Sequence, residues 1–178
     1  LAAAGAVATL AGHRRQARWA VAGVETLPNL LRNAPVMEAP VQLPAPSEGQ
    51  DLLADSASLG LTLGRHPLAL LRKRLAGMGF STAEKMRELP PGKPPIRTAG
   101  IVTGRQHPGT ASGVTFVTLE DETGSVNVIV WRDLAERQRR ELLFSSLMGV
   151  EGVLEREGEV THLIAGRLFD HSGLLGSL

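Results

Sequence analysis

The sequence predicts an α+β protein, in which a mostly helical N-terminal region precedes a small five-stranded β-barrel. Residues 113–131, GVTFVTLEDETGSVNVIVW, contain two runs of β-branched and aromatic residues around a polar, glycine-containing turn, which is the pattern of a β-hairpin. Residues 1–22 are rich in alanine and leucine and favour helices. The segment PPGKPP (90–95) can be neither helix nor central strand, so we place a domain boundary there.

Length and composition are those of one ordinary domain or two small ones. The 178 residues include no cysteine, which excludes disulfides and thiolate metal sites and suits a reducing cytosol. The longest apolar run, Leu1–Gly12, is too short to span a bilayer, and no basic stretch precedes it as in a secretory signal. We therefore expect a cytoplasmic protein with no membrane partner. The chain begins without methionine and in the middle of a pattern, as a fragment does.

The formal net charge of +1 is unevenly distributed. Residues 1–96 carry 11 Lys or Arg against 7 Asp or Glu, a net charge of +4. Residues 97–178 carry 8 against 11, a net charge of −3. Because nucleic-acid-binding domains usually present a basic surface, any strand binding by the second half is expected to be weak or local.

The N-terminal helices are expected to break near Gly12, where glycine tolerates a positive φ. Three arginines then fall on about one side of the second helix: Arg14, Arg15 and Arg18. They form either the phosphate-facing edge of a helical DNA-binding module or a solvated basic face beside a core-facing Trp19. Taken alone, the pattern favours the solvated face.

Five prolines interrupt residues 26–50, which predicts a connector without long regular elements. Residues 51–75 return to helical periodicity, with Pro67 in the first turn of a helix and His66 as a capping or loop residue. The basic triplet 72–74 is interpreted as a solvated helix end. Two capping boxes are predicted, Ser81 with Glu84 and Asp133 with Glu136.

After the boundary, short strands follow one another with one helix among them. The strands are expected at 97–107, 114–120, 125–131, 146–157 and 159–170. The helix begins at Asp133, between the third and fourth strands, and the last residues are expected to be a fraying tail. This order of elements, in about 80 residues, is that of an OB-fold, a five-stranded Greek-key barrel.

No catalytic constellation is apparent. The sequence has no glycine-rich phosphate loop and no histidine pair at metal spacing, so neither catalytic residues, metal ligands nor a cofactor are expected in this chain. The acidic cluster Glu120–Glu122 is interpreted as a solvated turn rather than a metal site. His107 has no accompanying nucleophile.

A nucleic-acid-binding face is easier to predict, since OB barrels bind single strands across strands two and three and the adjoining loops. The candidates on this sequence are Arg105, Gln106, His107, Thr110, Ser112, Phe116, Thr118, Asn127, Ile129, Trp131, Arg132 and Arg156.

Arginines in this set supply phosphate contacts, and aromatic rings offer stacking surfaces. The aromatic residues have a second interpretation, as fillers of the barrel. For Phe116 we favour the core, whereas for Trp131 the two interpretations are even. Loss of Arg105 is expected to matter more than loss of either aromatic residue.

Long motifs resemble a known family. AGIVTGRQHPGTASGVTFVTLEDETGSVNVIVW (99–131), with RDLAERQRREL and GVLEREGEVTHLIAGRLFD after it, is similar to the C-terminal OB domain of the bacterial C-family DNA polymerases. Among these, it most resembles the error-prone, damage-inducible paralogue of the polymerase III alpha subunit. LAAAGAV and GHRRQARW resemble the end of that family's helix-hairpin-helix region, and LGLTLGRHPLALLR (59–72) the segment that joins it to the OB domain.

The resemblance implies four parts: the end of a helix-hairpin-helix module at 1–25, a helical and proline-rich connector at 26–95, a nucleic-acid-binding OB domain at 96–171 and a tail at 172–178. It also implies a parent DNA-directed DNA polymerase, a nucleotidyltransferase of DNA replication, DNA repair and translesion synthesis after DNA damage. The two Mg²⁺ ions of that enzyme are held by aspartates of a palm domain outside this chain. Its implied partners are template DNA, the sliding clamp and an inactive Y-family-like accessory polymerase.

Two other functions are compatible with the sequence. An OB module that recruits accessory polymerase subunits without touching DNA is favoured by the net charge of −3. The anticodon-binding barrel of a class II aminoacyl-tRNA synthetase shares the hairpin pattern, but a large catalytic domain normally follows it, whereas this chain ends eight residues after its last strand.

Overall fold

The computed structural model describes residues 5–24, 39, 41–59, 64–92, 95–108, 113–158 and 160–178. They form two compact units, one within residues 1–64 and one within residues 65–178. No helix in these described ranges is long and apolar enough to cross a bilayer.

The first unit consists of three helices and an extended segment. The helices are α1 (Ala8–Ala11), α2 (Arg14–Ala22) and α3 (Glu48–Leu59). Gly12 has a φ of +86° and separates α1 from α2, as predicted. The side chain of Gln16 binds residues 41–43 in extended form: its Nε2 donates to the Val41 carbonyl at 2.8 Å, and its Oε1 accepts from the Leu43 amide at 2.9 Å.

The prediction of a solvated face on α2 is wrong for Arg14 and Arg15, which are partly buried, whereas Arg18 is exposed. Arg14 makes an ion pair with Asp55, and Arg15 donates to the carbonyl of Pro44 at 3.0 Å. Trp19 is 55% exposed, so the prediction that it faces a core is wrong. The buried residue of α2 is Ala17. Trp19 follows it by two residues, so the helical period turns the two side chains to opposite sides.

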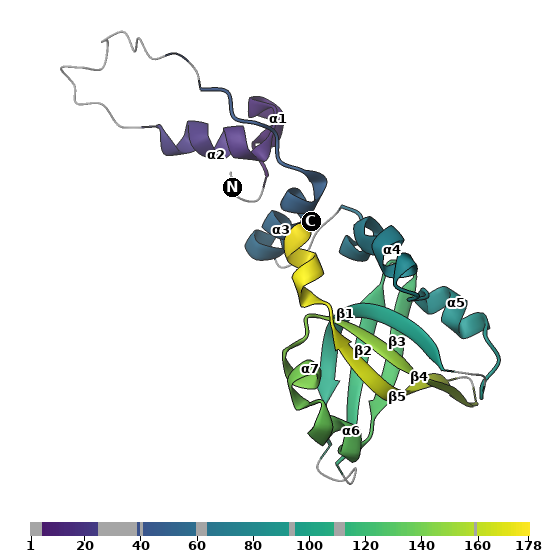
Figure 1. Cartoon of the computed structure of the whole chain (residues 1–178). Helices are drawn as coiled ribbons and strands as arrows, with labels where there is room; N and C mark the ends of the chain where they lie inside the picture. The colour runs from purple at the N-terminus through teal and green to yellow at the C-terminus, as the bar shows by residue number, and fades with distance from the viewer. Residues whose placement is uncertain are drawn as a thin grey trace. The chain divides into compact units, whose positions relative to one another are not determined.

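The second unit contains a closed barrel (Figure 1). Its strands are β1 (Ile96–Gln106), β2 (Thr115–Asp121), β3 (Gly124–Val130), β4 (Leu147–Glu157) and β5 (Val160–Asp170). They are ordered β1-β2-β3-β5-β4; β3 and β5 are parallel and every other pair is antiparallel. Each predicted strand agrees with the structure to within one residue at either end. The predicted OB-type barrel is therefore confirmed.

Side chains alternate along the strands between the interior and the outside of the barrel, and the inward-facing ones fill it. The buried side chains include Val117, Leu119, Val126, Val128, Val130, Met148, Val150, Leu154, Leu163 and Leu168. Residues between them on β2 and β3 face outward, as the two-residue period of a strand requires. Phe116 is one of these and is 37% exposed, so the interpretation that favoured a core position for it is wrong.

The barrel is accompanied by the helices α4 (Pro67–Gly77), α5 (Ala83–Glu88), α6 (Arg132–Arg137) and α7 (Arg139–Phe144), and the last three of these close it. Ala83 and Met86 of α5 join the core, and so do Leu134 of α6 and Leu142 of α7. Since α5 lies at the turn of the β2–β3 hairpin and α6 follows the end of β3, the core is covered at both ends (Figure 1).

Neither capping box forms. The N-cap of α5 is Thr82, whose hydroxyl accepts from the Lys85 amide at 3.3 Å, because Ser81 is held in a β-bridge to Thr98. At α6 the N-cap is Trp131, without a side-chain cap. Asp133 instead lies in the first turn, where its charge still complements the helix dipole.

A second apolar cluster packs outside the barrel. Leu68, Leu71 and Leu75 of α4 contact Phe80 and Leu147 there. The final residues form a 3₁₀-helix, η1 (Ser172–Ser177), that adds three half-buried leucines: Leu174, Leu175 and Leu178. The prediction of a fraying tail is wrong, because these leucines bury apolar area against α4. The compact unit begins at Arg65 and so includes α4 and α5, which precede the predicted boundary.

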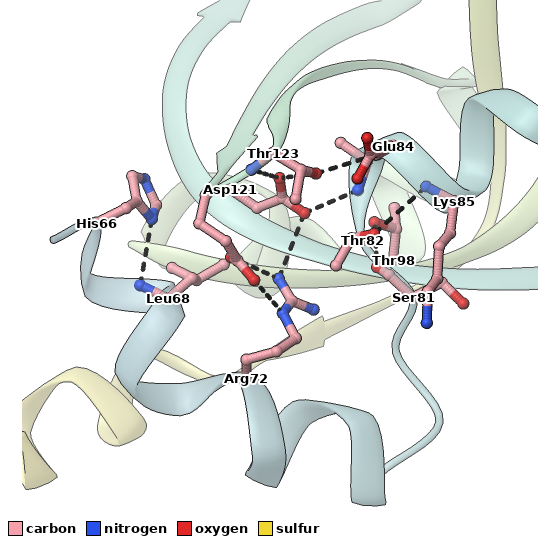
Figure 2. Close-up of polar contacts among 12 residues, drawn as sticks. His66, Leu68, Arg72, Ser81, Thr82, Glu84, Lys85, Thr98, Asp121 and Thr123 are labelled. Atoms are coloured by element: carbon pink, nitrogen blue, oxygen red, sulfur yellow. Dashed lines mark hydrogen bonds and ion pairs between the residues drawn. The ribbon is translucent and has the colours of Figure 1, made fainter.

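A buried carboxylate ties α4 and α5 to the β2–β3 turn (Figure 2). Asp121 is 5% exposed and accepts hydrogen bonds from the amide of Ala83 at 2.8 Å and from the amide and hydroxyl of Thr123, both at 2.7 Å. Arg72 of α4 donates to Asp121 at 3.3 Å and to Glu122 at 2.5 Å. The interpretation of a solvated turn is therefore wrong for Asp121 and Glu122, and that of a solvated helix end is wrong for Arg72. Glu120, Lys73 and Arg74 are exposed, as predicted.

His171 is packed among aromatic rings. It lies edge-on to Phe80 at 5.1 Å between centroids and parallel to Phe169 at 6.1 Å. Its Nε2 is buried and has no hydrogen-bond partner among the described residues. Burial lowers the pKa of His171, against the opposing attraction of Asp170, because the apolar neighbours cannot solvate the imidazolium.

This arrangement predicts a pH-dependent stability. A folded-state pKa below the unfolded value of about 6.5 gives stability that is complete above that pH and is lost as the pH falls through the lowered pKa. Thermal unfolding of the wild type and of His171→Phe between about pH 8 and about pH 5 measures it. The wild type is expected to lose more stability than the variant on acidification. Parallel losses would contradict the prediction, since both chains share all other titrating groups.

Candidate nucleic-acid interface

Two rows of outward-facing side chains cross the β2–β3 hairpin. The strand register aligns Gln106, Phe116 and Ile129 in one row, and Gly104, Thr118 and Asn127 in the next. The first row continues into Ile164 of β5 and the second into His162. These residues offer an aromatic face, apolar surface and amide or hydroxyl hydrogen-bonding groups, and they hold no carboxylate or guanidinium.

A cleft of about 610 Å³ borders the first row, which it shares through Gln106. Its lining comes from the end of β1, the start of β2 and the helices α6 and α7: Arg105, Gln106, His107, Gly113, Thr115, Arg132, Ala135, Glu136, Arg139, Leu142 and Leu143. Three arginines against one glutamate give this lining a net charge of +2. The cleft is thus locally basic, although residues 97–178 are acidic overall.

The predicted site residues fall into several groups. Phe116, Thr118 and Asn127 lie on the sheet face, and Gln106 links that face to the cleft. Arg105, His107 and Arg132 line the cleft with it. Trp131 is 55% exposed at the start of α6. Thr110 and Ser112 lie outside the described residues.

Arg156 is separated from the cleft. Its guanidinium donates to the carbonyl of Arg87, which lies on α5, at 3.0 Å, and to the hydroxyl of Thr161 at 3.4 Å. These contacts place it on the side of the barrel covered by α5, whereas α6 and α7 form the cleft wall. The structure therefore does not bring Arg156 together with Arg105.

Arg105 is hydrogen-bonded to backbone carbonyls. Its Nε donates to the carbonyl of Leu142 at 2.6 Å and an Nη donates to that of Ser145, so it holds the C-terminal end of α7 against β1. Desolvation lowers the pKa of Arg105 from its usual value, yet the guanidinium remains protonated at neutral pH. The sequence cannot reveal this role, because nothing in it places the end of α7 beside β1.

Arg132 forms an ion pair with Glu136, with 2.8 Å between Nε and Oε1. That hydrogen bond raises the pKa of Arg132, and the exposed side chain remains accessible at the mouth of the cleft. Gly113, with a φ of +85°, allows the Arg132 stem to pack closely, since a Cβ there would lie 2.9 Å from Cδ of Arg132.

His107 turns back toward the barrel. Its Nδ1 lies 3.2 Å from the hydroxyl of Thr115, the first residue of β2. This contact joins the residue after β1 to the start of β2 at the cleft wall. His107 thus has a structural role there.

Seven of the lining residues were not among the predicted site residues, and two of these seven, Arg139 and Leu143, are exposed side chains of α7. A signal for Arg139 exists in the sequence, because it follows Arg132 by seven residues and that spacing brings two residues to one side of a helical segment. Leu143 is 45% exposed and also lines the cleft. It lies on α7, which a break at Gln138 separates from α6.

Comparison with solved structures finds partial likenesses. An asparaginyl-tRNA synthetase from Pyrococcus horikoshii aligns with 51% of this chain and 22% of its own, at 18% identity and a TM-score of 0.42. The S. pombe Stn1-ten1 complex aligns with 43% of this chain and 57% of its own, at 19% identity and a TM-score of 0.37. Likenesses at these scores carry no argument about function.

Sequence relatives are much closer. Residues 96–170 match the family described as OB-fold nucleic acid binding domain. The whole chain is 61% identical to an error-prone DNA polymerase of Azoarcus sp. and 56% identical to one of Pseudomonas aeruginosa, and it spans about 17% of the length of each. The resemblance drawn from the sequence motifs is thereby confirmed: along its entire length this chain is similar to part of the error-prone DNA polymerases, and the residues of its barrel match the family of OB-fold nucleic acid binding domains.

Proposed function

We propose that this chain is the C-terminal nucleic-acid-binding part of an error-prone, C-family DNA polymerase, and that its barrel contacts the single-stranded template. The main observation is the outward face of the β2–β3 hairpin, on which an exposed Phe116 lies between Gln106 and Ile129 and beside a basic cleft. An aromatic ring of this kind stacks with any base, and neighbouring Thr and Asn groups hydrogen-bond to base edges.

The wider role of the longer protein is part of the proposal. We propose that the longer protein carries out template-directed nucleotidyl transfer in the cytoplasm, with lesion bypass during DNA repair and damage-induced mutagenesis; the similarity to proteins named error-prone DNA polymerase supports the polymerase activity. The sliding clamp and an inactive Y-family-like polymerase are proposed partners. We propose that the Mg²⁺ ions of that protein are held by residues outside this chain. We propose that this chain alone does not polymerise DNA.

Substituting Phe116 by alanine tests the binding face. Loss of one stacking contact, worth about 1–3 kcal/mol, is expected to weaken binding of labelled oligo-dT about tenfold at low salt. Fluorescence anisotropy across a salt series measures it. Binding by the wild type is expected at about micromolar concentration, and it weakens as salt rises because phosphate contacts release counterions.

Phe144→Ala is the matched control. Phe144 is 74% exposed on α7 and is not among the residues that line the cleft. It is expected to leave the dissociation constant unchanged. If the wild type binds no oligo-dT at low salt, the DNA-binding proposal fails, and the net charge of −3 would then favour a barrel that docks accessory subunits.

A further inference from the structure

We infer that the strand leaves the sheet face and continues into the cleft between β1 and α7, where Arg139 binds a phosphodiester. This inference rests on the proposed function and adds a phosphate subsite to it. The first evidence is that the sheet face and the cleft adjoin each other. Gln106 pairs with Phe116 in the first row and also lines the cleft, and so does Thr115, the residue before Phe116.

The cleft has the size and character of a nucleotide site. Its volume of about 610 Å³ falls within the range of pockets that enclose small ligands. Leu142 and Leu143 supply apolar surface from α7, and Ala135 adds to it from α6. Three arginines at the wall match the negative charge of a phosphate.

The three arginines differ in the hydrogen bonds and ion pairs that they already make. Arg105 donates to the carbonyls of Leu142 and Ser145, and Arg132 is paired with Glu136. Arg139, exposed at the first position of α7, makes no hydrogen bond or ion pair among the described residues. A phosphate that enters the cleft therefore meets one guanidinium whose donors are all available, and that residue is Arg139. Arg105 is a positioning residue that fixes the α7 wall.

The substitution Arg139→Ala tests this assignment in the full chain. Each phosphate contact to a single strand contributes about 0.7 to the slope of log K against log salt concentration. We expect Arg139→Ala to reduce that slope by about 0.7 and to weaken oligo-dT binding severalfold at low salt, whereas Arg139→Lys keeps the slope. Arg140→Ala is the matched control, because Arg140 is the next residue, is also exposed and is not among the lining residues.

The outcomes are separable from those of the proposed function. A wild-type slope in Arg139→Ala, together with weaker binding by Phe116→Ala, overturns the phosphate subsite and leaves the sheet face intact. Absence of any binding by the wild type overturns both. Free dTTP at millimolar concentration is expected to leave the oligonucleotide bound; displacement that depends on Arg139 would assign the cleft to free nucleotides and overturn the inference. Unchanged thermal unfolding of Arg139→Ala is expected, since its side chain has no described partner to lose.

Discussion

Replacing Asp121 by alanine is expected to lower the free energy of unfolding of the barrel unit by about 3–5 kcal/mol, the loss typical of breaking a buried charge pair. The substitution removes the acceptor for the amides of Ala83 and Thr123 and leaves Arg72 with only Glu122 as its ion-pair partner. Since Ala83 begins α5, whose Met86 belongs to the core, loosening of this contact is expected to open one end of the barrel.

Urea unfolding followed by tryptophan fluorescence measures this loss. The chain has two tryptophans, so a Trp19→Phe background leaves Trp131 to report on the barrel unit alone. Glu120→Ala is the control: Glu120 is the preceding residue and is exposed, and its loss is expected to change the free energy by less than about 0.5 kcal/mol. Equal midpoints for Asp121→Ala and Glu120→Ala would contradict the structural role of Asp121.

Gly152→Ala is expected to cost about 3 kcal/mol, near the upper end for overpacking of a filled interior. A Cβ at Gly152 would lie 2.1 Å from the carbonyl oxygen of Ile164, and this obstacle is backbone that cannot rotate away. The close approach occurs where the β4–β5 register shifts between Glu151 and Gly152. The larger methyl group must therefore push two paired strands apart.

Gly166→Ala, on the neighbouring strand β5, is the control. It distinguishes the close contact at Gly152 from the general effect of replacing a glycine. A Cβ at Gly166 meets only the Glu151 carbonyl oxygen, at 3.6 Å, which is ordinary contact. We expect a change of less than about 0.5 kcal/mol in the same urea experiment. A similar loss in both variants would show that the Gly152 contact is not the cause.

The strands were predictable because their signal is local. Alternation of Val117, Leu119, Val126 and Val128 with polar residues is written in consecutive positions, and the turn at 121–124 carries its own polar and glycine residues. The same alternation assigns Phe116 to the outer face, since it adjoins Val117. A large apolar side chain nevertheless suggested the core, whereas the structure leaves Phe116 37% exposed.

Long-range polar contacts were not predictable. Arg72 and Glu122 are fifty residues apart, and Arg105 reaches a carbonyl thirty-seven residues away. In the sequence, Arg72 and Arg105 look like ordinary surface charges, because no local residue pattern marks an arginine whose partner is far away along the chain. Such contacts hold the walls of the candidate cleft together, which explains why Arg105 was predicted only as a ligand contact.

The closed order of the strands bears on how the barrel forms. Ile96 of β1 pairs with Gly152 of β4, so the chain must bring together residues that are far apart before that seam gains any hydrogen bond. Only three residue pairs join β3 to β5, from Asn127–His162 to Ile129–Ile164. Refolding is therefore expected on a timescale of about milliseconds to seconds, as in other domains dominated by non-local strand pairing. Until the β3–β5 seam closes, both of its strands present free edges to other chains, so refolding yield is expected to fall as protein concentration rises.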